Sequence, residues 1–139
     1  MILLDTNIVS EWVKPKPSAE LARWLDAQPE DELFISVITF AELRRGASLL
    51  PFGRKRDTLR RWIDSSLTDR FEGRTLTVDR TVCDVWGDLL ALSRQKGIAL
   101  SVMDGFIAAT AIAHQLTLAT RNTKDFLGLE FSLVDPFHA

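Results

Sequence analysis

The stretch MILLDTNIVS, residues 1–10, passes from an apolar run to polar residues and then to helical spacing. Residues 2–4 have the length and apolar character of a buried strand, and Asp5, Thr6 and Asn7 are residues that cap a following helix. The chain is therefore expected to turn from strand to helix at Asp5. Further strands of this kind are predicted at residues 33–38, 75–78, 116–120 and 131–134, each separated from the next by helical or turn-forming sequence.

Strands separated by helices predict βαβ units and a three-layer α/β fold, with a central, mostly parallel sheet flanked by helices. The helix that begins after Ser101 is apolar all round, which places it in the centre of the molecule. The 139 residues fit one domain, residues 1–139, with 46% hydrophobic and 26% charged residues. Cys83 lies in an apolar helical stripe and is expected to be buried. The N-terminal apolar run stops at Asp5, so we expect a soluble, cytoplasmic protein without a membrane segment.

Four acidic residues lie where apolar runs give way to helices: Asp5, Glu42, Asp104 and Asp125. In parallel α/β sheets, ligands bind beyond the carboxyl ends of the strands, so one edge of the sheet can collect all four. Carboxylates without histidine or cysteine beside them suit a hard divalent cation such as Mg²⁺ or Mn²⁺. Such a site indicates phosphate chemistry, in which the ion relieves the repulsion between the acids and binds phosphate oxygen.

A structural interpretation competes with this one. Thr39 with Glu42 and Ser101 with Asp104 have the spacing of a helix capping box, and Asn122 with Asp125 has the same form. Each of these pairs alone is more typical of a cap than of a catalytic site. The set of four acids, together with Asp5 directly after a buried strand, is what favours a site.

A basic stretch lies between residues 44 and 61, where seven cations stand against one acid, for a net charge of +6. The formal charge of the whole chain is −2, so the remainder carries −8. Cations beside an acidic site can position a phosphodiester backbone, although they can equally form a solvated helix face or receive an acidic protein partner. The seven candidates for nucleic-acid or partner contact are Arg44, Arg45, Arg54, Lys55, Arg56, Arg60 and Arg61.

Four blocks of the sequence carry a family resemblance: ILLDTN at residues 2–7, ITFAELRRG at 38–46, DGFIAATA at 104–111 and TRNTKDF at 120–126. In this order and combination they resemble the PIN domain ribonucleases. More narrowly, the chain is similar to the VapC toxins of bacterial toxin–antitoxin pairs, in their FitB-like branch. The match runs over nearly the whole chain, and the ending Asp135-Pro136-Phe137 replaces the Asn-Pro-Trp common in this branch.

The resemblance implies a Mg²⁺- or Mn²⁺-dependent endoribonuclease with a PIN fold, which forms a homodimer and is inhibited by a cognate antitoxin. Asp5, Glu42 and Asp104 match the three acids of the family motif. The fourth position falls on Asn122 or Asp125, and we favour Asp125. Asp5 and Asp104 are expected to be metal ligands, Glu42 a ligand or a base, and Asp125 an outer ligand. Thr6, Thr120 and Asn122 are candidates to support these carboxylates.

Two alternatives to an RNA-cutting toxin stay open at this point. A catalytically inactive PIN-like module that binds RNA or protein would be expected to lack some of the acids, and none is missing. A DNA-directed nuclease is also compatible with the residues, because nothing in the sequence reads the 2′-hydroxyl of RNA.

Overall fold

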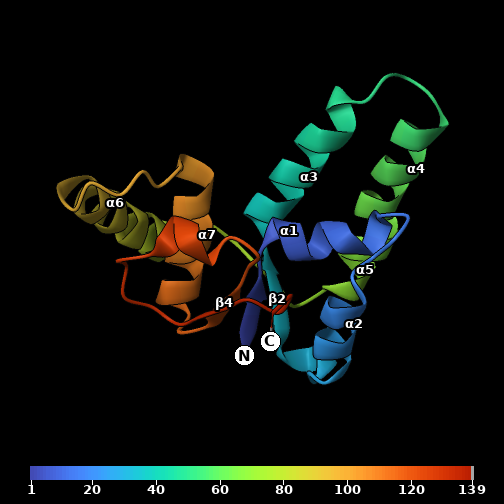
Figure 1. The fold of residues 1–139 in the computed structure, drawn as a ribbon. Helices are drawn as coiled ribbons and strands as arrows, with labels where there is room; N and C mark the ends of the chain where they lie inside the picture. Colours follow the sequence, from blue (N-terminus) through green and yellow to red (C-terminus); the bar gives the residue numbers. More distant parts are fainter. Residues whose placement is uncertain (139) are drawn as a thin grey trace.

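The computed structural model describes residues 1–138 and shows a five-stranded sheet with helices on both faces (Figure 1). The strands lie in the order β3-β2-β1-β4-β5, and every pairing is parallel. The predicted α/β fold with a mostly parallel sheet is therefore confirmed. The strands are β1 (Ile2–Leu4), β2 (Leu33–Ser36), β3 (Thr75–Leu76), β4 (Thr117–Ala119) and β5 (Leu133–Val134).

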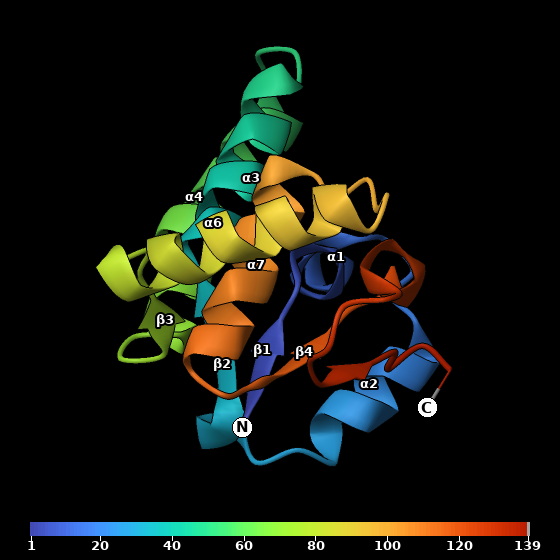
Figure 2. The ribbon, with the colours of Figure 1, turned by 90° about the vertical axis from the view of Figure 1, so that its left-hand side faces the viewer.

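The helices that precede β3 in the sequence cover one face of the sheet, and the two long helices that follow β3 cover the other (Figure 2). Leu3 packs into one core with α6 (Arg80–Gln95) and α7 (Val102–Ala113). Leu4, the next residue, packs into the other core with the helices before β3, because successive side chains of a strand point to opposite faces. Those helices are α1 (Thr6–Val9), η1 (Ser10–Val13), α2 (Ala19–Asp26), η2 (Glu30–Glu32), α3 (Val37–Leu49), α4 (Arg54–Arg61), η3 (Trp62–Leu67) and α5 (Thr68–Arg70).

The elements around α6 and α7 follow the local sequence closely. Asp79 accepts a hydrogen bond from the Val82 amide at the start of α6. Gly97 follows that helix with φ 71°, a conformation that glycine adopts without strain. Ser101 caps α7, which is buried along most of its length, so the predicted central position of this helix is confirmed.

The structure also corrects several local predictions. Strand β2 ends at Ser36, whose hydroxyl accepts from the Ile38 amide, so α3 begins at Val37 rather than after Thr39. Residues 54–70 form a helical stretch in which a π-helical segment, η3, lies between α4 and α5. Cys83 is exposed, and the prediction of burial is wrong, because Val82 and Leu89 define the inward face of α6 and Cys83 is turned about 100° away from Val82.

Within residues 1–138, no helix combines the length and the apolar character that crossing a lipid bilayer requires.

Candidate active site

The carboxyl ends of β1 and β4 lie side by side and bring Asp5 next to Thr120. Leu4 pairs with Ala119 in the sheet, so the residue after each strand faces its counterpart. The Asp5 amide donates to the Ala119 carbonyl at 2.9 Å, and the Thr120 hydroxyl donates to Asp5 Oδ2 at 2.8 Å. The sheet register thus places Asp5 at the edge where the sequence predicts a site.

Asp5 is buried among hydrogen-bond donors and carries no direct cation partner. Its Oδ1 accepts from the Thr6 amide at 2.7 Å, which makes Asp5 the N-cap of α1. The Asn7 side-chain amide donates to the Thr120 hydroxyl at 3.2 Å and lies 3.4 Å from Asp5 Oδ2. The same Thr120 oxygen accepts from the Asn122 amide at 3.1 Å, so the hydroxyl donates one hydrogen bond and accepts two.

Asn7 is a site residue that the sequence did not single out. Its Oδ1 accepts from the Arg121 amide at 3.2 Å, so Asn7 joins the start of α1 to the turn after β4 from both ends of its side chain. Asn7 lies two residues after the acid that ends a strand, and that position could have indicated a role in the site. We interpreted it only as part of the start of a helix. A hydrogen bond across 114 positions of sequence leaves no local trace.

Glu42 comes to the same edge from the second turn of α3. The Thr6 hydroxyl donates to Glu42 Oε1 at 2.6 Å and lies 3.1 Å from the Thr39 hydroxyl. Because the Thr6 proton goes to the carboxylate, Thr39 is the donor in its contact with Thr6. Ser36 is the cap of α3, so the alternative interpretation of Thr39 and Glu42 as a capping box is wrong. Both side chains instead face the start of α1.

Asp104 and Asp125 enter from the α7 side. Asp104 lies half-buried in the first turn of α7, where its amide donates to the Ser101 hydroxyl at 3.2 Å, so Ser101 is a helix cap as its spacing indicated. Asp125 lies in η4 (Thr123–Phe126), whose N-cap residue Asn122 makes no capping hydrogen bond through its side chain. Asn122 is exposed and contacts the site through its backbone amide alone.

The four acids act on one another electrostatically in a series that runs from Glu42 through Asp5 and Asp104 to Asp125. Burial, with smaller contributions from the charges of Asp104 and Glu42, raises the pKa of Asp5 from 3.8 to about 6, against the opposing effect of its hydrogen bonds from Thr120 and Thr6. Burial and the charge of Asp125 raise the pKa of Asp104. Among residues 1–138, none of the ion pairs involves these four carboxylates. Their repulsion is therefore not offset by any side-chain cation.

The chemistry of this set fits a hard divalent cation, because every side-chain ligand it offers is a carboxylate oxygen. In the described part of the chain, no three acidic, histidine or cysteine side chains gather closely enough to hold one ion in common. Mg²⁺ is usually held by one or two carboxylates and keeps several waters, so a pair of these acids meets its requirement. Asp5 and Asp104 are the pair with raised pKa values.

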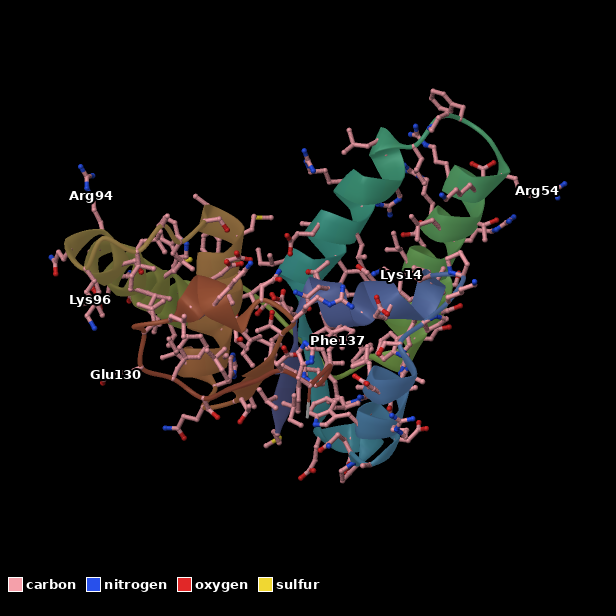
Figure 3. The ribbon with its side chains drawn as sticks, in the orientation of Figure 1. Lys14, Arg54, Arg94, Lys96, Glu130 and Phe137 are labelled. Atoms are coloured by element: carbon pink, nitrogen blue, oxygen red, sulfur yellow. The ribbon has the colours of Figure 1, made fainter. Side chains whose placement is uncertain are left out.

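The C-terminal segment packs against the turn that carries Thr120. The Arg121 guanidinium lies 3.8 Å from the ring centroid of Phe137 and 3.5 Å from a carboxylate oxygen of buried Glu11. Glu11 also pairs with Lys14. Figure 3 shows Phe137 beside α1, where the end of the chain returns to the site. Phe137 thus provides an aromatic surface under Arg121.

The seven cations of the basic stretch divide into two groups. Some are used inside the protein: Arg44 pairs with Asp64, Arg56 donates to the carbonyls of Ser48 and Leu50, and Arg60 donates to the Ser48 hydroxyl. The others are exposed and form no ion pair within residues 1–138: Arg45, Arg54, Lys55 and Arg61.

Comparison with known proteins places these residues in a family. A model of the PIN domain matches residues 2–131. The chain is 38% identical to the toxin FitB of Neisseria gonorrhoeae over 138 residues, which is 99% of each chain. It is 36% identical to a VapC ribonuclease of Sinorhizobium fredii, over 99% of this chain and 98% of that one. The crystal structure of FitAcB from Neisseria gonorrhoeae superposes with a TM-score of 0.93 at 37% identity and covers 100% of both chains.

Proposed function

The chain belongs to the PIN domain family, and we propose that it is a divalent-metal-dependent endoribonuclease, the toxin of a type II toxin–antitoxin pair. The names of its relatives support both halves of this proposal, since one is called a toxin and another a ribonuclease. The observation that carries the chemistry is a group of four carboxylates in which Asp104 and Glu42 repel Asp5, and Asp125 repels Asp104. None of the four forms an ion pair within residues 1–138. A single PIN-like nuclease domain of residues 1–139 would perform the reaction.

Asp5 and Asp104 would hold Mg²⁺ or Mn²⁺ directly. Glu42 would act as the base that orients water or as a ligand through a bound water, and Asp125 as an outer ligand, because no three acids of the described chain gather closely enough to hold one ion in common. A bound ion of this kind supplies a water of lowered pKa and offsets charge on the phosphodiester. The residues of the chain itself orient the carboxylates. The Thr120 hydroxyl fixes Asp5 Oδ2, and the Thr6 hydroxyl fixes Glu42 Oε1, so each acid keeps one oxygen pointed in a set direction.

The partners follow from the same proposal. RNA is the substrate, a cognate antitoxin is the inhibitor, and a homodimer is the expected assembly in the cytoplasm. An antitoxin that inserts a basic side chain among the acids would compete with a metal ion for the same charge. Calorimetric titration of Mg²⁺ into free protein and into the inhibited complex tests this route, and equal uptake by both would contradict it.

The central test is RNA cleavage by purified protein with Mg²⁺ or Mn²⁺ and with a chelator. Asp5→Asn and Asp104→Asn should each lower the cleavage rate by at least about a hundredfold, the scale of losing one preorganised charged group at a reacting centre. Asp88→Asn removes an exposed acid of α6 in the same protein and should leave the rate unchanged.

Equal cleavage by wild type and both site variants would assign the activity to a contaminating nuclease and reject the proposal. A DNA strand of the same sequence in the same reaction distinguishes a DNA-directed nuclease. RNA binding without cleavage or Mg²⁺ uptake would identify an inactive binding module instead.

A further inference from the structure

Helices α3 and α4 form an arm that projects from the sheet, and one face of α3 leads from the acids to the end of this arm (Figure 1). Glu42, Arg45, Gly46 and Leu49 are spaced at i, i+3, i+4 and i+7, so they share that face. Arg45, Gly46 and Leu49 are all exposed. A Cβ atom added at Gly46 would meet nothing within 4 Å, so the middle of the face is open.

An exposed aromatic ring stands at the end of this face. Phe52 is 90% exposed, the largest exposed fraction of any large hydrophobic side chain in the described chain, and Leu49 beside it is 69% exposed. The Arg56 guanidinium lies 4.3 Å from the Phe52 ring centroid and is itself held by the carbonyls of Ser48 and Leu50. The ring is therefore supported by a fixed cation while most of its surface meets solvent.

Exposed cations lie on both sides of Phe52 in the sequence. Arg54 and Lys55 follow it directly, and Figure 3 shows Arg54 directed away from the body of the protein. Arg45 lies between the ring and Glu42 on the same face of α3. The distance along α3 from Glu42 to Leu49 is about 10 Å, at 1.5 Å per residue, which is the scale of a few nucleotides of a single strand.

We propose that this face of the arm, from Arg45 across Gly46 to Phe52, is the path along which single-stranded RNA leaves the acids, with one base stacked on Phe52 and the phosphates beside Arg45 and Arg54. The inference rests on the proposed nuclease function and specifies how the substrate is held. Single-strand binding sites combine two features: cations along the nucleic-acid backbone and an aromatic side chain on which a base stacks.

RNA accounts for this surface better than a protein partner does. The exposed apolar side chains at the end of the arm are few, whereas a stable protein interface buries about 800 Å² on each partner. A cationic surface beside an acidic site is complementary to a phosphodiester backbone.

The test measures RNA binding and RNA cleavage with the same set of full-length variants. Affinity for an RNA of about 16 nucleotides is read by fluorescence anisotropy in chelator, so that nothing is cut, with a length chosen to exceed a typical single-strand site. Phe52→Ala should weaken binding about fivefold to a hundredfold, the range that loss of one base stack spans, and Phe52→Leu should weaken it similarly if stacking rather than apolar contact matters.

Two further matched pairs of variants test the position of the RNA on α3 and the contribution of charge separately. Gly46→Glu places a carboxylate on the open face and should weaken binding at least about tenfold, whereas Gly46→Ala should bind as wild type does. Arg45→Ala should lower the slope of log affinity against log salt by about 0.7, the share of one phosphate contact on a single strand. Arg80→Ala, which removes an exposed arginine of α6, should leave that slope unchanged.

Cleavage in Mg²⁺ separates this inference from the proposed function. Phe52→Ala, which lies ten positions after Glu42 and beyond the end of α3, should raise KM and leave kcat at saturating RNA unchanged. The RNA path would be wrong if wild-type protein cuts RNA and the Gly46→Glu and Phe52→Ala variants have the same RNA affinity and KM as wild type. The arm would then be assigned to contact with a protein partner. Wild-type protein that cuts no RNA would instead reject the nuclease function.

Discussion

Replacing Asp5 with asparagine is expected to stabilise the metal-free protein at neutral pH, although the same change should abolish cleavage. Burial, followed by the charges of Asp104 and Glu42, raises the pKa of Asp5 from 3.8 to about 6. A pKa difference of one between the folded and unfolded protein corresponds to about 1.4 kcal/mol. Ionised Asp5 therefore destabilises the folded protein by about 3 kcal/mol at pH 7.5. Asparagine has no charge and removes this penalty.

Lost hydrogen bonds offset part of the gain. Asp5 accepts from the Thr6 amide at 2.7 Å and from the Thr120 hydroxyl at 2.8 Å, and asparagine has only one oxygen to accept with. Losing one bond to a charged group costs about 1.5 kcal/mol. The net stabilisation is then about 1–2 kcal/mol, which for a chain of this length raises Tm by roughly 4–8 °C.

The gain should depend on pH with a defined sign. The unfolded state gives up the Asp5 proton first as pH rises, so the penalty is absent below pH 3.8, grows between pH 3.8 and about 6, and is complete above that. Calorimetric unfolding of wild type and variant in chelator, at about pH 4 and pH 7.5, checks this. Added Mg²⁺ should raise the Tm of wild type more than that of the variant, since a cation relieves the repulsion that asparagine removes. A variant less stable than wild type at pH 7.5 in chelator, or one with the same gain at pH 4, would refute the reasoning.

Three other changes test the surroundings of the site. Gly105→Ala would place a Cβ atom 2.6 Å from a leucine side chain of α6 and should lower the free energy of unfolding by about 1–3 kcal/mol in urea titration, whereas Gly87→Ala, with nothing within 4 Å, should raise it by about 0.5–1 kcal/mol. Thr120→Val removes a hydrogen bond that lowers the pKa of Asp5, so the acidic limb of the cleavage profile should move to higher pH, while Thr120→Ser should keep it in place. Burial raises the pKa of Glu11, but hydrogen bonds from Lys14 and Ser18 together with the charges of Lys14 and Arg121 hold that pKa below its ordinary value. Glu11→Gln should therefore lower the free energy of unfolding by about 1–3 kcal/mol at pH 7, and the difference from wild type should shrink as the solution is acidified through that pKa.

The sequence predicted the features that depend on short range. The strand–acid–helix junction at Asp5 and the cap at Ser101 follow from residues within one turn of each other. The parallel sheet followed from the alternation of strands and helices, because parallel strands need a crossover between them. These features are local or topological, so a single sequence contains them.

The sequence reasoning missed a helix start where local signals conflict, and a feature that depends on contacts between distant elements. The β-branched residues Val37 and Ile38 favour strand by propensity, but the Ser36 hydroxyl caps a helix there, and that helix delivers Glu42 to Thr6. Gly105 shows a related difficulty. A glycine inside a helix indicates a packing constraint, but only the position of α6 against α7 reveals that side chains of α6 fill the space where its Cβ would stand.

The way the protein holds its acids explains why their charge remains available. Hydroxyl and amide donors from Thr6, Asn7 and Thr120 orient the carboxylates, while the arginines nearby are directed elsewhere: Arg121 pairs with Glu11, and Arg44 pairs with Asp64. An arginine among the acids would lower their pKa values and stabilise the fold, but it would also satisfy the charge that a metal ion requires. Neutral donors fix the geometry and leave the repulsion in place. Burial of the ionised Asp5, together with this repulsion, makes the folded protein less stable, and the relief of both becomes part of the affinity for a divalent cation.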